Sequence, residues 1–144
     1  MDIIENIVHE SEWMRITEKF TPSEIENSAE LDIQNAAKEV EIDIEGTIGG
    51  SMWDDDDEKN INTKEKMKKE LRYLSDLKTK KITVNINSLG GSFNHAISIH
   101  DLLASNKAHV TTKLNGMSAS ASTIIAQAGN DRQMSENALL LIHR

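Results

Sequence analysis

Three serines stand close together in a stretch that could carry out nucleophilic chemistry. Ser118, Ser120 and Ser122 lie between an alternating apolar segment and a helix-like segment. A turn between a strand and a helix can hold a nucleophile at the edge of a sheet, beside free helix N–H groups that favour developing negative charge. Serine is also a preferred N-cap residue, so this stretch alone leaves helix capping as the alternative.

Two further features would add to such a site. His143 ends a terminal apolar segment and has the side chain most often used as a general base. Gly90 and Gly91 carry no side chain, so their backbone N–H groups can approach a substrate closely. A serine hydrolase needs a nucleophile, a base, a group that orients the base and two oxyanion donors. The sequence therefore offers most of the parts of a serine hydrolase site.

Other chemistries find less support. A glycine pair can also bind phosphate, but the chain has neither a G-x-x-x-x-G-K-[ST] loop nor a G-x-G-x-x-G fingerprint. It contains no cysteine, and its other four histidines lack the spacing of metal ligands, so we expect no metal site and no cofactor. The acidic run at 54–57 lacks the alternate ligands and the glycine of an EF-hand and predicts a solvated loop.

Composition indicates one domain with an aliphatic core. The chain has 144 residues and only 3% aromatic residues. No run of 18 apolar residues occurs and the acidic N-terminus lacks a signal-peptide pattern, so we expect a cytoplasmic protein with no membrane contact. Residues 1–58 hold 18 acidic and 3 basic residues, and residues 59–144 hold 6 and 13. The basic residues do not alternate with aromatics, so we expect no nucleic-acid ligand.

Residues 1–39 are expected to be an acidic N-terminal extension, partly helical or disordered. The apolar residues at 3, 4, 7 and 8 have helical spacing, and the capping-box form of Thr21–Glu24 predicts a helix from about Pro22 to Lys38. Residues 40–144 are expected to form the catalytic domain.

Apolar periodicity predicts the elements of that domain. Period-two alternation predicts strands at 40–48, 81–87 and 110–114, and a short run of apolar residues predicts a final strand at 138–143. Helical spacing predicts helices at 62–78 and 93–105 and a third helix that follows the serine turn and ends at Gly129 as its C-cap.

The predicted buried face of the helix at 93–105 consists of residues at i, i+3, i+4, i+7 and i+10, namely Phe93, Ala96, Ile97, His100 and Leu103. The glycines predict a turn at Asn87–Ser92, and a loop is expected at 130–137.

The alternation of strands and helices predicts an α/β fold with a parallel sheet covered by helices. In such sheets the functional site lies beyond the carboxyl ends of the strands. Gly90–Gly91, Ser118 with Ser120, and His143 all fall at such ends, so we expect them to lie together.

Four segments carry a resemblance to a known family. They are INSLGGS at Ile86–Ser92, GMSASAS at Gly116–Ser122, AQAGNDRQM at Ala126–Met134 and LLLIHR at Leu139–Arg144. In this order and spacing they resemble the ClpP-type serine peptidases, and most of all the ClpP-related head-maturation proteases of phages. The resemblance implies a ClpP/crotonase-like fold of stacked ββα units, incomplete at the C-terminus.

The resemblance also implies roles for single residues. Ser120 takes the position of the nucleophile and His143 that of the general base. The N–H groups of Gly91 and Ala121 take the positions of the oxyanion donors.

An extended peptide substrate would pair with the main chain along Gly90, Gly91 and Ser92. No residue matches the acid of the family's triad; Asp131 is the nearest upstream acid, but the motif gives it no role. Leu89 and Ser118 stand where the family usually has Pro and Ala.

The expected activity is therefore that of a serine endopeptidase working through an acyl-enzyme. The implied partners are a peptide or protein substrate and further copies of the chain in a ring. A bacterial source would add an ATPase partner, and a phage source would make the scaffold or capsid protein the substrate. Two alternatives stay open: a crotonase-type acyl-CoA enzyme, and a truncated or inactive ClpP-like subunit that acts only in assembly.

Overall fold

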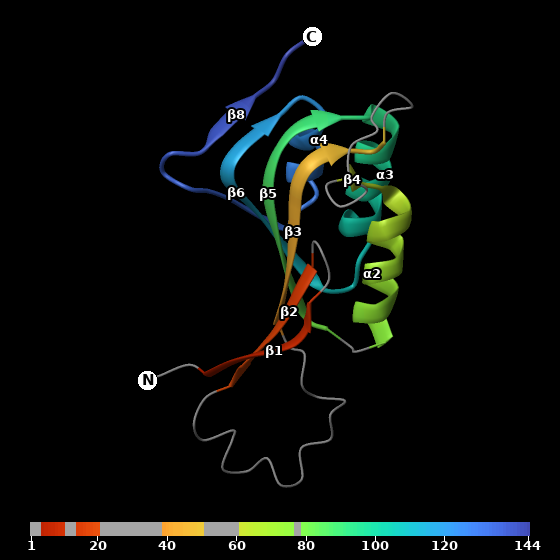
Figure 1. Cartoon of the computed structure of the whole chain (residues 1–144), viewed down its shortest axis with the longest axis vertical. Coiled ribbons are helices and arrows are strands. Elements are labelled where there is room, and N and C mark those ends of the chain that lie inside the picture. Colours follow the sequence, from red (N-terminus) through yellow and green to blue (C-terminus); the bar gives the residue numbers. More distant parts are fainter. Residues whose placement is uncertain (1–3, 11–13, 21–38, 51–60, 77–78) are drawn as a thin grey trace, which may run out of the picture.

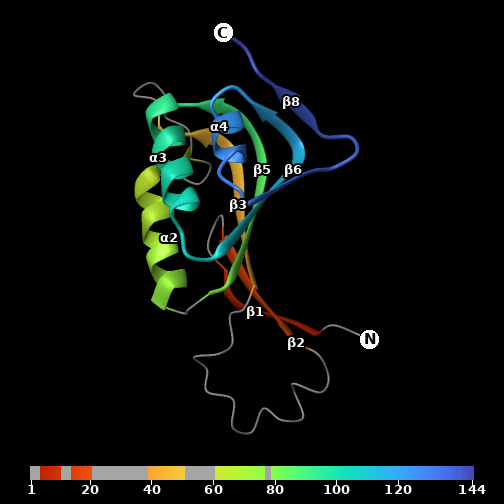
Figure 2. The same ribbon diagram turned by 180° about the vertical axis from the view of Figure 1, so that it is seen from behind.

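The computed structural model describes residues 4–10, 14–20, 39–50, 61–76 and 79–144. Its strands are β1 (Ile4–Glu10), β2 (Met14–Phe20), β3 (Glu39–Ile48), β4 (Ile61–Asn62), β5 (Lys81–Gly91), β6 (His109–Ala119), β7 (Asp131–Met134) and β8 (Leu139–Leu141). Its helices are α2 (Lys64–Asp76), α3 (Phe93–Ala104) and α4 (Ser122–Ala126). The three helices lie on one face of a curved sheet (Figures 1 and 2).

The centre of the sheet is a parallel ladder of β3, β5 and β6. Ile44 pairs with Ile86, which in turn pairs with Leu114, and all three side chains are buried on the face that carries the helices. Because side chains alternate along a strand, the polar residues between them lie on the opposite face. The α/β architecture with a parallel sheet that the sequence predicts is confirmed.

The sheet continues beyond this ladder at both sides. Its strand order is β1-β2-β3-β5-β6-β7, with β4 attached to β3 and β8 attached to β6. The sequence predicted a loop at 130–137, but residues 131–134 form β7, which pairs in parallel with β6. All four side chains of β7 are exposed, so the segment has no apolar alternation by which it could be predicted.

The two long helices pack against each other and against the sheet. Met67, Leu71 and Leu74 of α2 are buried, as their spacing predicts. Within the described ranges, no helix is long and apolar enough to cross a membrane.

The buried face of α3 differs in part from the predicted one. Ala96 and Leu103 are buried, but Ile99 joins them, whereas Phe93 and Ile97 are exposed and His100 is half-buried. This helix is apolar on more than one side, so its periodicity could not decide which side faces the core.

The strands β5 and β6 run further than predicted. Ser88–Gly91 was expected to be part of a turn, yet Ser88 pairs with Ser118 of β6 and Gly90 pairs with Thr47 of β3. Two neighbouring strands supply hydrogen-bond partners here, and they override the turn preference of glycine.

Gly129 does not end α4 as a C-cap. The helix ends at Ala126, and Gln127 occupies the C-cap position. A Cβ atom on Gly129 would lie 2.7 Å from Oγ1 of Thr112 and 2.8 Å from its backbone N. Glycine is therefore required at this position by the close approach of β6.

The N-terminal part contains a hairpin in place of the helical pattern. Strands β1 and β2 pair antiparallel, and β2 continues the sheet through the pair Met14 and Ile42. The hairpin lies at the end of the sheet opposite to β8 and the C-terminus (Figure 1). The predicted helix at 22–38 and the acidic run at 54–57 lie outside the described residues.

Candidate active site

Ser120 occupies a strained turn between β6 and α4. Its φ is 54°, and among the described residues no other non-glycine residue has a positive φ. The left-handed conformation costs an L-residue about 1–2 kcal/mol. Such strain is typical of functional sites, and a sharp strand-to-helix turn is the device that exposes the serine of many hydrolases.

The three serines differ in what their side chains do. Ser118 and Ser122 are 0% exposed, whereas Ser120 is half-buried and reaches the surface. Ala121 occupies the N-cap position of α4, and no side chain caps this helix. The capping alternative is therefore wrong, and Ser120 is the serine of this group that a substrate can reach.

Backbone hydrogen bonds hold the turn on both sides. The Ser120 N–H donates to the carbonyl of Leu141 in β8 at 3.0 Å. The Ser120 carbonyl accepts from the Thr123 N–H at 3.0 Å and from the Thr123 Oγ1 at 2.7 Å. The Ser120 turn is thereby joined to the strand that precedes His143.

The glycine pair lies directly against this turn. A Cβ atom on Gly90 would lie 2.7 Å from the Ala119 carbonyl oxygen, 2.8 Å from the Ser120 Cβ and 2.9 Å from the Ala121 N. A Cβ atom on Gly91 would overlap the carbonyl oxygen of Ile48. Residues without a side chain are therefore needed at both positions.

Polar groups near the glycine pair already have partners. The Gly90 N–H donates to the Ser88 Oγ at 3.1 Å, and the Ser92 N–H donates to the Ile48 carbonyl at 2.7 Å. The Ser92 Oγ caps α3 by accepting from the His95 N–H at 3.5 Å. Of the three residues predicted to bind substrate, Gly91 is the one that lines the pocket described next.

A pocket of about 280 Å³ brings the predicted site residues together. Its lining consists of Gly91, Phe93, Ser120, Ala121, Thr123, Ile124, Ile142 and His143. The pocket thus holds the predicted nucleophile, base and both oxyanion residues. The apolar wall of Phe93, Ile124 and Ile142 was not predicted, because an apolar residue beside a motif carries no signal that separates a binding wall from core.

His143 is exposed and its Nδ1 lies 3.0 Å from the carbonyl oxygen of Arg144. A carbonyl only accepts, so this contact requires the proton on Nδ1 and leaves the lone pair on Nε2. Nε2 is then the atom able to accept a proton. Within the described residues, no hydrogen bond or ion pair joins His143 to an aspartate or glutamate side chain.

Asp131 is held elsewhere. Its Oδ2 lies 2.7 Å from the Nε2 of His109. Asp131 pairs with Thr111 near the start of β6, whereas β8 pairs with the end of β6 at Ala119. Eight residues of strand separate these points, which corresponds to about 26 Å. Asp131 therefore does not orient His143.

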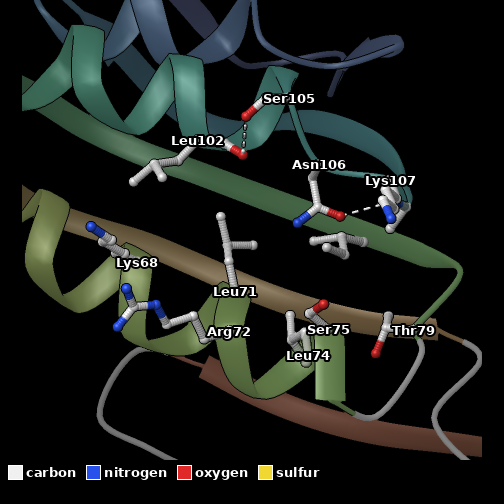
Figure 3. A pocket seen from close by; sticks show the side chains of 12 residues that line it. Lys68, Leu71, Arg72, Leu74, Ser75, Thr79, Leu102, Ser105, Asn106 and Lys107 are labelled. Carbon is white, nitrogen blue, oxygen red and sulfur yellow. Dashed lines mark hydrogen bonds between the residues drawn. The ribbon is translucent and has the colours of Figure 1, made fainter.

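A larger cavity, of about 590 Å³, lies between α2 and the end of α3 (Figure 3). Its floor is apolar, with Leu71 and Leu102, and Lys68, Arg72 and Lys107 stand at its rim. Its lining contains no histidine and no carboxylate, so it lacks the kind of base that the sequence predicts beside the nucleophile. The chemistry is better supported at the smaller pocket.

Comparisons with known proteins point in the same direction. The family described as Clp protease matches residues 56–144. The chain is 47% identical over 68 residues to the ATP-dependent Clp protease proteolytic subunit of Leuconostoc citreum, covering 46% of this chain and 34% of that protein. It is 40% identical over 65 residues to proteolytic subunit 1 of the ATP-dependent Clp protease of Rhodococcus jostii, covering 44% and 30%.

Solved structures with the same fold include two ClpP proteins. The ClpP protease catalytic domain of Plasmodium falciparum superposes with a TM-score of 0.58 at 26% identity, covering 72% of this chain and 54% of that one. ClpP1 of Listeria monocytogenes superposes with a TM-score of 0.59 at 28% identity, covering 72% and 55%. The matched part thus spans about a third of the curated relatives and about half of the solved chains.

Proposed function

The chain belongs to the Clp protease family, and we propose that it is a serine-type endopeptidase subunit with Ser120 as nucleophile and His143 as general base. One observation carries this proposal. The strained, accessible Ser120 shares a pocket of about 280 Å³ with His143 and with the backbone of Gly91 and Ala121. The larger cavity described above has serines but no histidine in its lining.

The proposed reaction proceeds through an acyl-enzyme. His143 Nε2 takes the proton of the Ser120 hydroxyl as its oxygen attacks the peptide carbonyl. The N–H groups of Gly91 and Ala121 stabilise the negative charge that develops on the carbonyl oxygen. The imidazolium returns its proton to the leaving amine. Water then attacks the ester with the same base, which releases the carboxylic acid and restores Ser120.

The apolar wall supports a substrate preference. Phe93 and Ile142 are 61% and 73% exposed at the pocket, and Ile124 lies beside them. Burial of an apolar substrate side chain against such surface is favourable by about 25 cal/mol per Å². We therefore expect cleavage next to apolar residues.

The alternative as an acyl-CoA enzyme has less support. Such an enzyme would need a carboxylate in its pocket, and the lining around Ser120 contains none. The curated relatives are proteolytic subunits. The prediction of phage head maturation, with a scaffold or capsid protein as substrate, stays a prediction from the sequence alone.

The proposal extends to assembly. Leu139, Leu141 and Ile142 are each more than half exposed, a display of apolar surface that is typical of an interface. We propose that copies of the chain form a ring and that, as the names of the curated relatives suggest, an ATPase works with it. Light scattering on the purified chain tests the first part: a monomer at all concentrations contradicts it.

Labelling with a fluorophosphonate probe followed by peptide mass mapping tests the nucleophile. The expected result is one adduct on Ser120, which the Ser120→Ala variant loses and the Ser118→Ala variant keeps. A folded chain that does not react would contradict the proposed chemistry and favour the alternative of a subunit that acts only in assembly.

A further inference from the structure

Two buried hydroxyl groups behind the nucleophile turn have no part in the proposed chemistry. Ser118 and Ser122 are 0% exposed, and their Oγ atoms lie 3.1 Å apart. The Ser122 Oγ also lies 2.8 Å from the carbonyl oxygen of Ala119 and 3.0 Å from that of Ser88. Burying hydroxyl groups is costly unless they are hydrogen-bonded, so the arrangement of these bonds defines what the pair does.

The direction of each bond follows from the number of protons. Ser122 has one hydroxyl proton, and both carbonyl oxygens beside it can only accept. That proton is therefore shared between Ala119 and Ser88, which leaves a lone pair of Ser122 for Ser118. The Ser118 hydroxyl donates to the Ser122 Oγ and so fixes its orientation.

This chain of bonds connects the two halves of the candidate site. Ala119 immediately precedes Ser120, and Ser88 lies two residues before Gly90 in β5. The Ser88 Oγ accepts from the Gly90 N–H at 3.1 Å and donates to the Gly46 carbonyl of β3 at 2.5 Å.

Strand pairing makes this connection only in part, because the last pair of β5 and β6, Ser88 with Ser118, follows an irregularity. The pairing of β5 with β6 shifts between Ile86 and Ser88, so the ladder is irregular just before it reaches the site. The side-chain hydrogen bonds of Ser118 and Ser122 add to the ladder at this irregular point.

We propose that Ser122 is a positioning residue, oriented by Ser118, that sets the distance between the Ser120 turn and the glycine strand that carries Gly91. This inference rests on the proposed roles of Ser120 and Gly91. Ser122 touches no substrate. It acts by holding the Ala119 and Ser88 carbonyls at one point, which fixes where the nucleophile and an oxyanion donor stand relative to each other.

The expected effect is a change in rate at unchanged fold. Loss of one oxyanion donor costs about 10²–10³ in rate, and a displacement of about 1 Å costs about 10². Ser122→Ala loosens the spacing without removing a donor, so we expect Ser120 to react with the fluorophosphonate about tenfold more slowly. Ser118→Ala removes the orienting bond alone, and we expect a decrease of about threefold.

Thr112→Val is the matched control. Thr112 is also buried, and its Oγ1 donates to the Ala126 carbonyl at 2.7 Å, away from the Ser120 turn. It should lower the melting temperature as Ser122→Ala does, because a buried carbonyl loses its donor in both variants. Its labelling rate, measured well below all melting temperatures, should equal that of the unaltered chain.

Hydrogen exchange supplies a readout that needs no reaction. Amides at 88–91 should exchange faster in Ser122→Ala than in the unaltered chain, and Thr112→Val should leave them unchanged. Unchanged exchange at 88–91, or equal labelling rates in Ser122→Ala and Thr112→Val, would overturn the positioning role. Absence of labelling in the unaltered chain would instead overturn the proposed nucleophile, and the exchange result would still decide whether Ser122 joins the two segments.

Discussion

Gly90→Ala is the substitution that most directly probes the packing of the site. Gly90 has a φ of 101°, which side-chain-bearing residues rarely adopt. Its new methyl group would also lie 2.7–2.9 Å from three atoms of the Ser120 turn. Two of these, the Ala119 carbonyl oxygen and the Ala121 N, are backbone atoms that cannot rotate away.

The expected loss of stability has two parts. The unfavourable φ costs about 1–2 kcal/mol. Overpacking a rigid, buried position costs about 1–3 kcal/mol more. Gly90→Ala should therefore lower the free energy of unfolding by about 2–5 kcal/mol, which lowers the urea midpoint by about 1–2.5 M at a denaturant slope of about 2 kcal/mol/M.

Gly116→Ala is the control for this measurement. Gly116 also has a positive φ, of 142°, but its Cβ would meet Asn87 Oδ1 at 2.6 Å. This atom belongs to an exposed side chain that can turn aside, and water can then replace it as the acceptor of the Met117 N–H, which donates to it at 3.1 Å. The cost of the unfavourable φ remains in this variant, and the cost of overpacking is largely absent. Urea unfolding followed by circular dichroism should show Gly116→Ala to be less destabilised than Gly90→Ala by about 1–3 kcal/mol. Equal midpoints would refute the argument that the backbone of the turn is rigid against Gly90.

Three further variants test other parts of the structure. His95→Phe removes the Nδ1 that accepts the Lys64 N–H at 3.2 Å at the start of α2, so thermal unfolding should show a loss of about 0.5–2 kcal/mol, and an unchanged melting temperature would contradict this capping role. Asn62→Leu removes the side-chain N–H groups that donate to the Glu45 and Thr47 carbonyls at 2.6 and 3.0 Å, so urea unfolding should show a free energy of unfolding lower by about 2–4 kcal/mol. A decrease below about 1 kcal/mol would mean that water replaces these bonds. Phe93→Asp places a charge at the apolar wall, so kcat/KM should fall about tenfold for peptides with leucine before the cleaved bond and stay the same with glycine there; equal effects on both peptides would remove Phe93 from substrate selection.

The sequence predicted the centre of the fold because its signals there are strong and local. The alternation at 40–48 and 81–87 reflects strands with one buried face, and both strands form where expected. Leucines at helical spacing likewise predicted α2. In these segments the propensity of the residues and their tertiary contacts agree.

The errors fall where neighbouring strands decide the structure. The glycines at 90 and 91 favour a turn in isolation, but they pair with β3 and belong to strand β5. The apolar residues near the N-terminus have helical spacing, but this segment forms strand β1, which pairs with β2. Hydrogen-bond partners far away in the sequence leave no trace in a local pattern.

In the candidate site, the positions of Ser120 and His143 were predictable, and the apolar wall and the buried serines were not. Ser120 and His143 come from segments with a recognisable order and spacing, and both line one pocket. The inward direction of Ser118 and Ser122 follows from the geometry of β6 and α4 and could not be predicted from three serines in a row of small residues.

The Ser120 N–H donates to the Leu141 carbonyl, so the conformation of the Ser120 turn depends on whether strand β8 is folded. All three side chains of β8 are exposed, so its attachment depends largely on main-chain hydrogen bonds to β6. Segments held in this way open at lower free energy than the core. We expect β8 to detach while the rest of the sheet stays folded, which would carry His143 away from Ser120 and separate the proposed base from the proposed nucleophile. The proposed proteolytic activity would then depend on contacts that hold β8 against the sheet.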